Sequence, residues 1–131
     1  SDLGENMNPW IQEVIDAHVI IEQWLGRKEG SAQALMSRFA QEFTMVPISG
    51  AKMDYPTVSG FFHSAGGSRP GLSIVVDNAQ VLSEWHDGGA VLYRESQTLP
   101  EQGEIVRWST AIFQRIEGKI FWRHLQETRI G

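Results

Sequence analysis

The spacing of apolar residues changes once along this chain, near a glycine-rich segment at residues 66–71. Before that segment, apolar side chains recur every three or four residues, which is the period of an amphipathic helix. After it they recur every second residue, which is the period of a strand whose two faces differ. Helices followed by strands joined by short turns are typical of the α+β class, in which helices pack on an antiparallel sheet.

The first part of the chain predicts three helices. Asn8 followed by Pro9 is typical of a helix start, and the apolar stripe that follows predicts a helix over about residues 9–28. Ser31 can cap a second helix. The residues expected along one face of that second helix are Leu35, Met36, Phe39 and Phe43. The segment 55–57, Tyr-Pro-Thr, begins a third helix that ends at the glycine-rich segment.

The second part of the chain predicts a meander of strands. The segment Asp-Gly-Gly at 87–89 is a strong hairpin turn, and Glu-Gly at 117–118 is a second one. A short strand is also expected at residues 43–48, where Pro47 limits it to an edge position. The four long strands are expected at residues 72–86, 90–98, 105–116 and 119–129.

Composition narrows the possible partners. The chain has no cysteine, which excludes disulfides and thiolate metal sites and fits a reducing cytoplasm, where we expect the protein. The net charge is −5 and the 11 basic residues are scattered, so we expect no nucleic-acid partner. No apolar run reaches the roughly 20 residues that cross a membrane. The four histidines lack metal-ligand spacing and no phosphate-binding motif is present, so we expect neither a metal nor a cofactor.

A length of 131 residues predicts one domain over residues 1–131, with residues 1–7 frayed at its start. Its sheet has one face for the helices, yet the other face also carries apolar side chains. These are Trp85, Trp108, Ile112 and Phe121. Because a second apolar face needs cover, we predict a homodimer that forms through this face of the sheet.

Two stretches resemble a known family. They are GGSRPGL at residues 66–72 and the pair RWSTAIF at 107–113 with WRHLQET at 122–128. With the order of elements, they resemble the nuclear transport factor 2-like (cystatin-like) superfamily, and in particular an uncharacterised, SnoaL-like branch. The last hairpin also looks like that of the calcium/calmodulin-dependent kinase association domain. The resemblance implies three N-terminal helices on a curved, mostly antiparallel sheet, which form a cone with an internal pocket.

That superfamily contains ketosteroid isomerase, scytalone dehydratase, limonene-epoxide hydrolase and polyketide cyclases, as well as proteins that only bind or assemble. Fold therefore does not fix function. The catalytic tyrosine and aspartate of the isomerase and the histidine and aspartate of the dehydratase are not recognisable in this sequence. No catalytic residue carries over from the family.

The last hairpin predicts the pocket's polar residues. If Glu-Gly at 117–118 is a two-residue turn, regular pairing sets one group of side chains on one face, and Tyr93 on a neighbouring strand can add its hydroxyl. The expected ligand-binding residues are Tyr93, Arg107, Ser109, Trp122, His124 and Gln126. The other face would carry Trp108, Thr110, Ile112, Phe121, Leu125 and Glu127. One extra residue near 124–126 would instead turn Glu127 toward the pocket.

Two residues are candidates for proton transfer. His124 is one, because histidine side chains commonly act as acids and bases in catalysis, and Glu127 could assist it only if the strand bulges. The competing interpretation is a hydrogen-bonded histidine on a half-buried strand. Arg107 and Glu95 are possible cross-strand neighbours, either as a surface ion pair or, if buried, with Arg107 binding an anion. His18, on the apolar stripe of the first helix, is interpreted as a core residue.

These observations leave three functional hypotheses. The first is a homodimeric domain that binds a small, largely apolar molecule in the cone. The second is a cofactor-free isomerase, dehydratase or cyclase that uses His124, Glu127 or Tyr93 as acid or base while Arg107 places an anionic group. The third is an assembly module with a vestigial pocket. A titratable group in a dry cavity, beside another polar group, would favour the enzyme.

Overall fold

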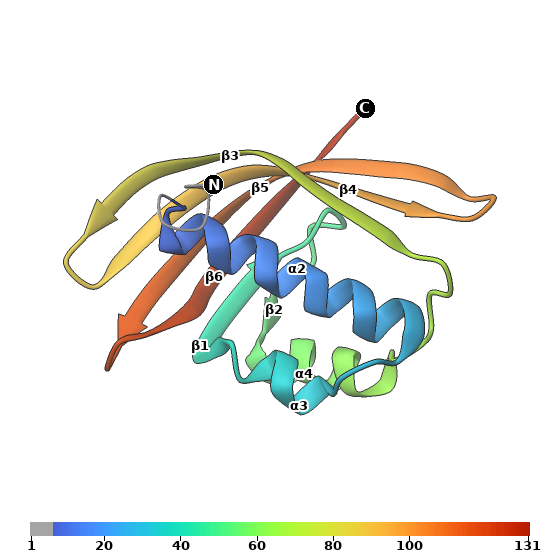
Figure 1. Cartoon of the computed structure of the whole chain (residues 1–131), viewed down its shortest axis with the longest axis horizontal. Helices are drawn as coiled ribbons and strands as arrows, with labels where there is room; N and C mark the ends of the chain where they lie inside the picture. Colours follow the sequence, from blue (N-terminus) through green and yellow to red (C-terminus); the bar gives the residue numbers. More distant parts are fainter. Residues whose placement is uncertain (1–6) are drawn as a thin grey trace.

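The structure, a computed structural model, describes residues 7–131, and in this part of the chain three helices lie on the concave face of a curved six-stranded sheet (Figure 1). The helices are α2 (Pro9–Arg27), α3 (Ala32–Met36) and α4 (Tyr55–Ser64). The strands are β1 (Phe39–Val46), β2 (Met53–Asp54), β3 (Ser73–Trp85), β4 (Gly88–Leu99), β5 (Gly103–Ile116) and β6 (Lys119–Ile130). The expectation that residues 1–7 are frayed falls, apart from Met7, outside the described residues.

The α+β class is confirmed, as are the first and third helices and the four long strands, each within a few residues of its predicted bounds. Asn8 caps α2, because its Oδ1 accepts a hydrogen bond from the backbone N–H of Trp10 at 2.8 Å. Asp54 caps α4 in the same way through Thr57 at 3.1 Å. Local capping and turn signals therefore set most element boundaries.

The prediction for the second helix is wrong beyond Met36. The helix α3 ends there, and Phe39 and Phe43 belong to β1. Both rings still point into the core, where the Phe39 ring stacks on Trp122 with centroids 5.8 Å apart. Two residues four apart lie on one face of a helix and also on one face of a regular strand, so their spacing alone does not choose between the two.

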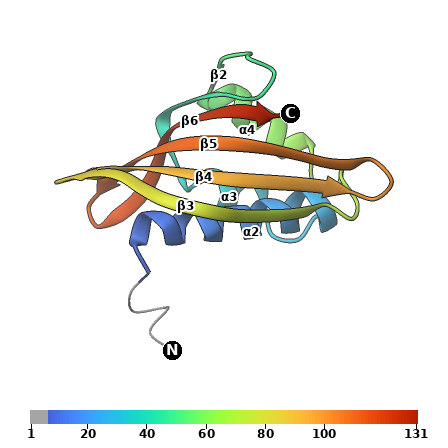
Figure 2. The same ribbon diagram turned by 90° about the horizontal axis from the view of Figure 1, so that it is seen from above.

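The sheet order is β2-β1-β6-β5-β4-β3. All neighbouring strands are antiparallel except β1 and β6, which run parallel. The long helix α2 crosses the concave face, and Figure 2 shows the four long strands from above with the helices behind them. No helix within residues 7–131 is long and apolar enough to cross a membrane.

The five tryptophans divide between two environments. Trp10, Trp24 and Trp122 are buried between the helices and the sheet, where Trp122 packs edge-on against Phe113 with centroids 4.7 Å apart. Trp85 and Trp108 lie on the outer face and are 46% and 40% exposed. The sequence-based prediction of apolar side chains on both faces is correct for these residues.

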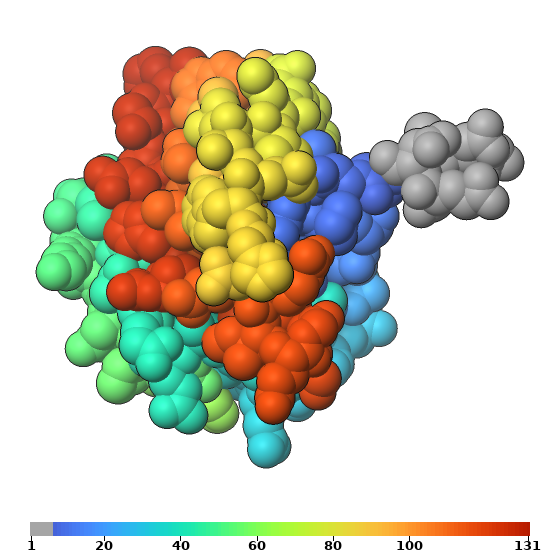
Figure 3. Space-filling model, turned by 90° about the vertical axis from the view of Figure 1, so that its left-hand side faces the viewer, coloured from blue at the N-terminus to red at the C-terminus, as the bar shows by residue number. Residues whose placement is uncertain are grey.

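One end of the molecule is closed by the turns of the two long hairpins, which lie beside the start of α2 (Figure 3). The Trp10 indole N–H donates to Glu84 of β3 at 2.8 Å. The Arg115 guanidinium lies over the same indole ring, 4.7 Å from its centroid. The backbone N–H of Arg115, near the end of β5, donates a hydrogen bond of 2.7 Å to the carbonyl of Asp87 in the turn between β3 and β4. This end is filled by side chains.

A one-residue bulge in β6 decides which residues of that strand face the helices. Phe113 pairs with Trp122, but Ile112, the next residue on β5, pairs with His124, so Arg123 is the extra residue. Because side chains alternate with a period of two, one extra residue reverses the facing of everything after it. Leu125 and Glu127 therefore face the helices, whereas the regular pairing that we predicted from the sequence placed them outside.

A candidate ligand-binding pocket between the helices and the sheet

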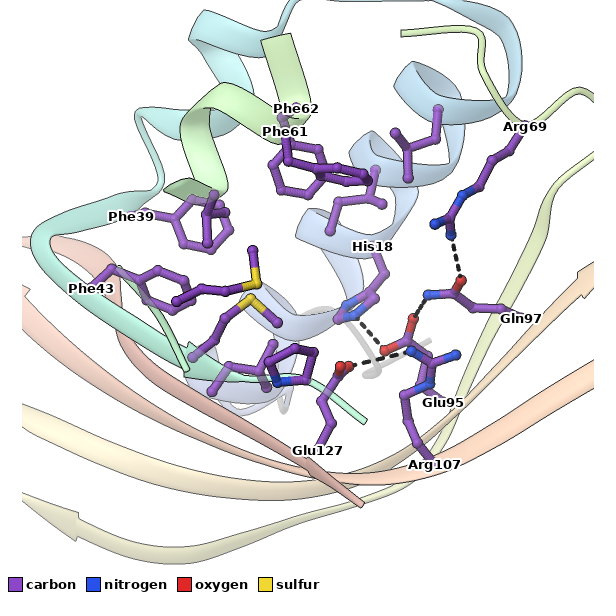
Figure 4. A pocket seen from close by; sticks show the side chains of 17 residues that line it. His18, Phe39, Phe43, Phe61, Phe62, Arg69, Glu95, Gln97, Arg107 and Glu127 are labelled. Atoms are coloured by element: carbon purple, nitrogen blue, oxygen red, sulfur yellow. Dashed lines mark hydrogen bonds and ion pairs between the residues drawn. The ribbon is translucent and has the colours of Figure 1, made fainter. Parts of the chain in front are cut away.

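The open end of the molecule holds a pocket of about 320 Å³ between α2, α4, β1, β2 and the inner face of β4, β5 and β6 (Figure 4). Most of its wall is apolar. The apolar lining consists of Ile21, Leu25, Phe39, Phe43, Met45, Pro47, Met53, Val58, Phe61, Phe62 and Leu125. The aromatic rings stand on the α4 and β1 side, opposite the polar side chains.

A chain of hydrogen bonds forms part of the polar wall. His18 of α2 donates through Nε2 to Glu95 Oε1 at 3.1 Å. Gln97 Nε2 donates to the other oxygen of Glu95 at 2.6 Å, and Gln97 Oε1 accepts from Arg69 Nη1 at 3.3 Å. His18 and Glu95 are 6% and 2% exposed, so their pairing takes place in the protein interior. Both oxygens of the Glu95 carboxylate are thus occupied.

The His18 ring is held as the cation. Its second nitrogen, Nδ1, lies 2.7 Å from the carbonyl oxygen of Val14. Because both ring nitrogens face acceptors, both must carry a proton, and the ring is then an imidazolium. Burial alone would lower the pKa of His18, but the Glu95 carboxylate and the Val14 carbonyl outweigh burial and raise it.

Arg107 and Glu127 form the second part of the polar wall. Arg107 on β5 is the register partner of Glu95 on β4, and Glu127 on β6 is the register partner of Ser109 on β5. Arg107 Nη1 lies 3.7 Å from Glu127 Oε2, which is an ion pair without a hydrogen bond. The buried Nε of Arg107 has no hydrogen-bond partner among residues 7–131. The guanidinium is therefore only partly satisfied by the protein.

The two carboxylates of the pocket differ in their affinity for protons. Burial, together with repulsion by Glu95, raises the pKa of Glu127 to about 7, although Arg107 and His18 oppose that change. Burial would also raise the pKa of Glu95, but His18, Gln97 and Arg107 outweigh it and lower that pKa to about 2. Glu95 is therefore a fixed anion, and Glu127 changes its charge near neutral pH.

Comparison with solved structures identifies the family. An NTF2-like protein of unknown function from Pseudomonas aeruginosa is 40% identical, with a TM-score of 0.88 over 93% of this chain and 98% of that one. This chain belongs to the NTF2-like family. No protein-family model matches the sequence, and a search of curated proteins finds no match.

More distant NTF2-like structures share the fold. An NTF2-like protein from Cytophaga hutchinsonii is 13% identical, with a TM-score of 0.70 over 95% of this chain and 100% of that one. A putative calcium/calmodulin-dependent kinase II association domain from Exiguobacterium sibiricum is also 13% identical, with a TM-score of 0.63 over 96% of this chain and 98% of that one. At this identity the likeness concerns the fold alone.

Some of the sequence-predicted residues of this NTF2-like chain lie at the pocket. Arg107 and Glu127 line it. Tyr93, Ser109 and Trp122 lie on the same face of the sheet but are buried in the core beside the pocket. The Trp122 indole N–H donates to Glu13 at 3.1 Å. The Tyr93 and Ser109 hydroxyls, on register partners, have no hydrogen-bond partner among residues 7–131, and burial raises the pKa of Tyr93 well above its usual value.

His124 and Gln126 lie on the outer face, contrary to the predicted pairing. His124 pairs with Ile112 instead of Ala111, and its Nδ1 shares a 2.7 Å hydrogen bond with Thr44 Oγ1 on β1. Its Nε2 lies 3.3 Å from Gln126 Oε1. The reason is the extra residue at Arg123, just before the range in which we considered a bulge. That alternative correctly turned Glu127 toward the helices.

The sequence interpretation missed part of the polar wall. It placed Arg107 and Glu95 correctly as neighbours, but it treated His18 as a core residue and did not consider Arg69 or Gln97. One signal was available: an acid within a strand of alternating apolar residues and a histidine on an apolar helix stripe are both costly to bury alone. Within residues 7–131, no group of three or more His, Asp or Glu residues is arranged to hold a metal ion.

Proposed function

We propose that this NTF2-like domain binds a small amphipathic molecule in the pocket, with its apolar body against the α4 and β1 side and its polar end toward His18, Arg107 and Glu127. The observation that supports this most is the composition of the wall. Six of the 17 lining residues are charged or polar and the other 11 are apolar. A concave, mostly apolar cavity with a few convergent polar groups is typical of small-molecule sites.

The volume limits the size of the ligand. One water molecule takes up about 30 Å³, so a pocket of about 320 Å³ has room for roughly ten groups the size of water. A neutral probe of this size is 3-phenylpropan-1-ol, whose binding can be followed by NMR of the backbone amides. We expect the resonances of residues around the pocket to shift as the concentration of the probe rises, and the shifts to level off at saturation.

A blocking variant tests the location. Met53 lies on the short strand β2 and is only partly buried, so Met53→Trp should occupy the pocket without disturbing the core. Val19→Trp is the matched control, because Val19 is 50% exposed on α2 and does not line the pocket. Loss of probe binding in the first variant but not in the second supports the proposal. Equal binding by both variants would place the probe elsewhere.

A second candidate function is acid–base catalysis, and the observation that favours it is the pKa of Glu127 near 7 inside the pocket. The Glu127 carboxylate would remove a proton from a carbon next to a carbonyl group. The electron pair of the C–H bond would move toward the carbonyl oxygen, and an Arg107 N–H would stabilise the resulting enolate. Return of the proton at the same or a neighbouring carbon would complete an exchange or an isomerisation.

Deuterium exchange tests this second candidate. In D₂O, 4-phenylbutan-2-one should exchange the hydrogens beside its carbonyl faster with the protein than without it. Glu127→Gln should lower this acceleration by about 100-fold or more, since a positioned base contributes at least that much. Exchange at the uncatalysed rate in the presence of wild-type protein that binds the ketone would leave only the binding function. His124, on the outer face, is not proposed as a catalyst.

We also propose that the domain is a homodimer that forms through the outer face of the sheet. Large apolar side chains are exposed there, among them Val75, Trp85 and Trp108, which are 53%, 46% and 40% exposed. Light scattering should give twice the chain mass, and Trp108→Glu should lower it to one chain. The control is Val19→Glu, because Val19 is 50% exposed on α2, away from this face. A wild-type protein that stays monomeric at high concentration would contradict the proposal.

The third hypothesis, an assembly module with a vestigial pocket, has less support. A pocket that no longer binds anything should be filled by side chains and should lack costly buried charges. Here a cavity of about 320 Å³ persists, and it is lined by Glu95, Arg107 and Glu127, whose side chains are 3%, 9% and 7% exposed. The proposed dimer interface lies on the outer face of the sheet and the pocket lies on the inner face. A dimer is therefore compatible with ligand binding.

A further inference from the structure

We infer that the molecule bound in the pocket is a monocarboxylate with an apolar body, and that its carboxylate pairs with Arg107. This inference rests on the proposed binding function and adds the chemical class of the ligand. Three features of the described residues lead to it: the unsatisfied guanidinium, the balance of charge in the polar wall, and the shape of the remaining cavity.

The Arg107 guanidinium lacks the hydrogen bonds that a buried arginine needs. The residue is 8% exposed, and its buried Nε has no hydrogen-bond partner among residues 7–131. The nearest carboxylate oxygen, on Glu127, lies 3.7 Å from Nη1, which is too long for a hydrogen bond. Glu95, the register partner of Arg107, already binds His18 and Gln97. A planar guanidinium with free donors matches a carboxylate in a two-point geometry.

The charges of the polar wall also favour an anion. His18 is an imidazolium, and Arg69 and Arg107 are cations, whereas Glu95 and Glu127 are the two carboxylates of the wall. Three positive and two negative groups leave one positive charge when Glu127 is ionised, and two when it is protonated. The chain as a whole carries −5, so the pocket reverses the sign of the protein around it. One ligand carboxylate balances this wall when Glu127 is ionised and leaves a single positive charge when Glu127 is protonated.

The alternatives fit less well. An ammonium group would face Arg107 and the His18 cation, which repel it. A phosphate dianion carries more charge than the wall balances while Glu127 is ionised, and it would then lie next to the Glu95 and Glu127 carboxylates. A neutral amphiphile has no carboxylate to pair with Arg107, so donors of the buried guanidinium would stay without a full hydrogen-bond partner, which costs free energy. The apolar wall of aromatic and methionine side chains then accommodates the rest of the molecule.

Binding of a carboxylate should bring a proton with it. The groups that face Glu127 are Arg107, Glu95 and His18, and Arg69 is linked to Glu95 through Gln97. A ligand carboxylate that engages Arg107 removes part of the attraction that favours the Glu127 anion and adds a like charge beside it. Glu127 then takes up a proton, and its carboxyl O–H can donate to the ligand. Above pH 7, affinity should fall by about tenfold for each pH unit.

Calorimetry with three matched probes tests the inference: 3-phenylpropanoate, 3-phenylpropanamide and 3-phenylpropan-1-amine. The carboxylate should bind about 10- to 100-fold more tightly than the amide, and the amine should bind most weakly. Repeating the titration in buffers with different ionisation enthalpies should show uptake of up to one proton per carboxylate bound. Uptake should disappear in Glu127→Gln, while the preference for the carboxylate remains.

Arg107→Gln should lose the preference for the carboxylate and keep amide binding. Arg94→Gln is the matched control, because Arg94 pairs with Asp77 on the outer face at 2.8 Å, and it should behave as wild type. If Arg107→Gln does not fold, the comparison of the three probes on the wild-type protein still shows whether the pocket prefers a carboxylate. Amide binding as tight as carboxylate binding would overturn this inference alone. No binding of any probe, the neutral alcohol included, would overturn the binding function itself.

Discussion

Replacing Glu127 with glutamine is expected to remove much of the pH dependence of the folding stability. The side chain is 7% exposed, and burial with repulsion by Glu95 raises its pKa from 4.5 to about 7. The folded protein therefore holds this proton more tightly than the unfolded chain does. The stability that the protonated group contributes is fully present below pH 4.5 and is lost as the pH rises through about 7.

The magnitude follows from the two pKa values. They differ by about 2.5, from 4.5 to about 7, and each pH unit corresponds to about 1.4 kcal/mol, so the complete loss is about 3 kcal/mol. Between pH 5 and pH 8 the linkage relation gives a loss of about 2 to 3 kcal/mol. Glutamine does not titrate, so the variant lacks this contribution.

Urea unfolding at pH 5, 6, 7 and 8, followed by tryptophan fluorescence, measures the effect. The free energy of unfolding of wild type minus that of Glu127→Gln should fall by about 2 to 3 kcal/mol from pH 5 to pH 8. His18, whose pKa is raised, also contributes stability that is lost as the pH rises, but it is present in both proteins and largely cancels. Glu42→Gln, on the exposed part of β1, is the control and should differ little from wild type at each pH. Parallel curves for wild type and Glu127→Gln would refute the reasoning.

Two further predictions concern packing and buried charge. Gly66→Ala should destabilise the fold by about 1–3 kcal/mol, because the added Cβ would lie 2.5 Å from the Trp24 indole. Gly60→Ala, which has open space around it on α4, should instead stabilise the fold by up to about 1 kcal/mol. Thermal unfolding measures both variants, and the opposite order of stabilities would contradict the packing. His18→Ala should cost about 3–5 kcal/mol in urea unfolding, because it leaves the Glu95 carboxylate buried without its cation, and adding Glu95→Gln should recover part of that loss. A double variant no more stable than His18→Ala would show that the carboxylate is not the cause.

Much of the fold could be predicted because its signals are local. Asn8 before Pro9, the Asp-Gly-Gly turn at 87–89 and the change of period each act over a few residues, and each gave an element close to its observed bounds. The end of α3 had no such signal. Phe39 and Phe43 satisfy the spacing of both a helix and a strand, and the choice between them depends on pairing with β6, which is distant in the sequence.

The prediction of which β6 residues face the pocket depended on one residue, Arg123, that no local sequence pattern marks. Arg123 is the extra residue of β6, and its guanidinium donates to the Glu42 carbonyl on β1 at 2.8 Å. The bulge thus lies where β6 passes from pairing with Phe39 to pairing with Thr44, and β1 has an irregular register over the same stretch. Because the irregularity belongs to both strands, reasoning on the last hairpin alone could name a bulge as an alternative but could not place it.

The position of the bulge explains why Glu127 joins the polar end of the pocket. Without it, Glu127 would lie on the outer face, and His124 and Gln126 would lie on the inner face. With it, the Glu127 carboxylate joins the Glu95 carboxylate, the His18 imidazolium and the Arg107 guanidinium next to packed aromatic rings. Well-packed apolar residues often stabilise a fold more than such a buried ionic group, so stability alone does not account for it. The carboxylate ligand that we propose would account for it, because its carboxylate would complete the hydrogen bonds that Arg107 lacks in the free protein.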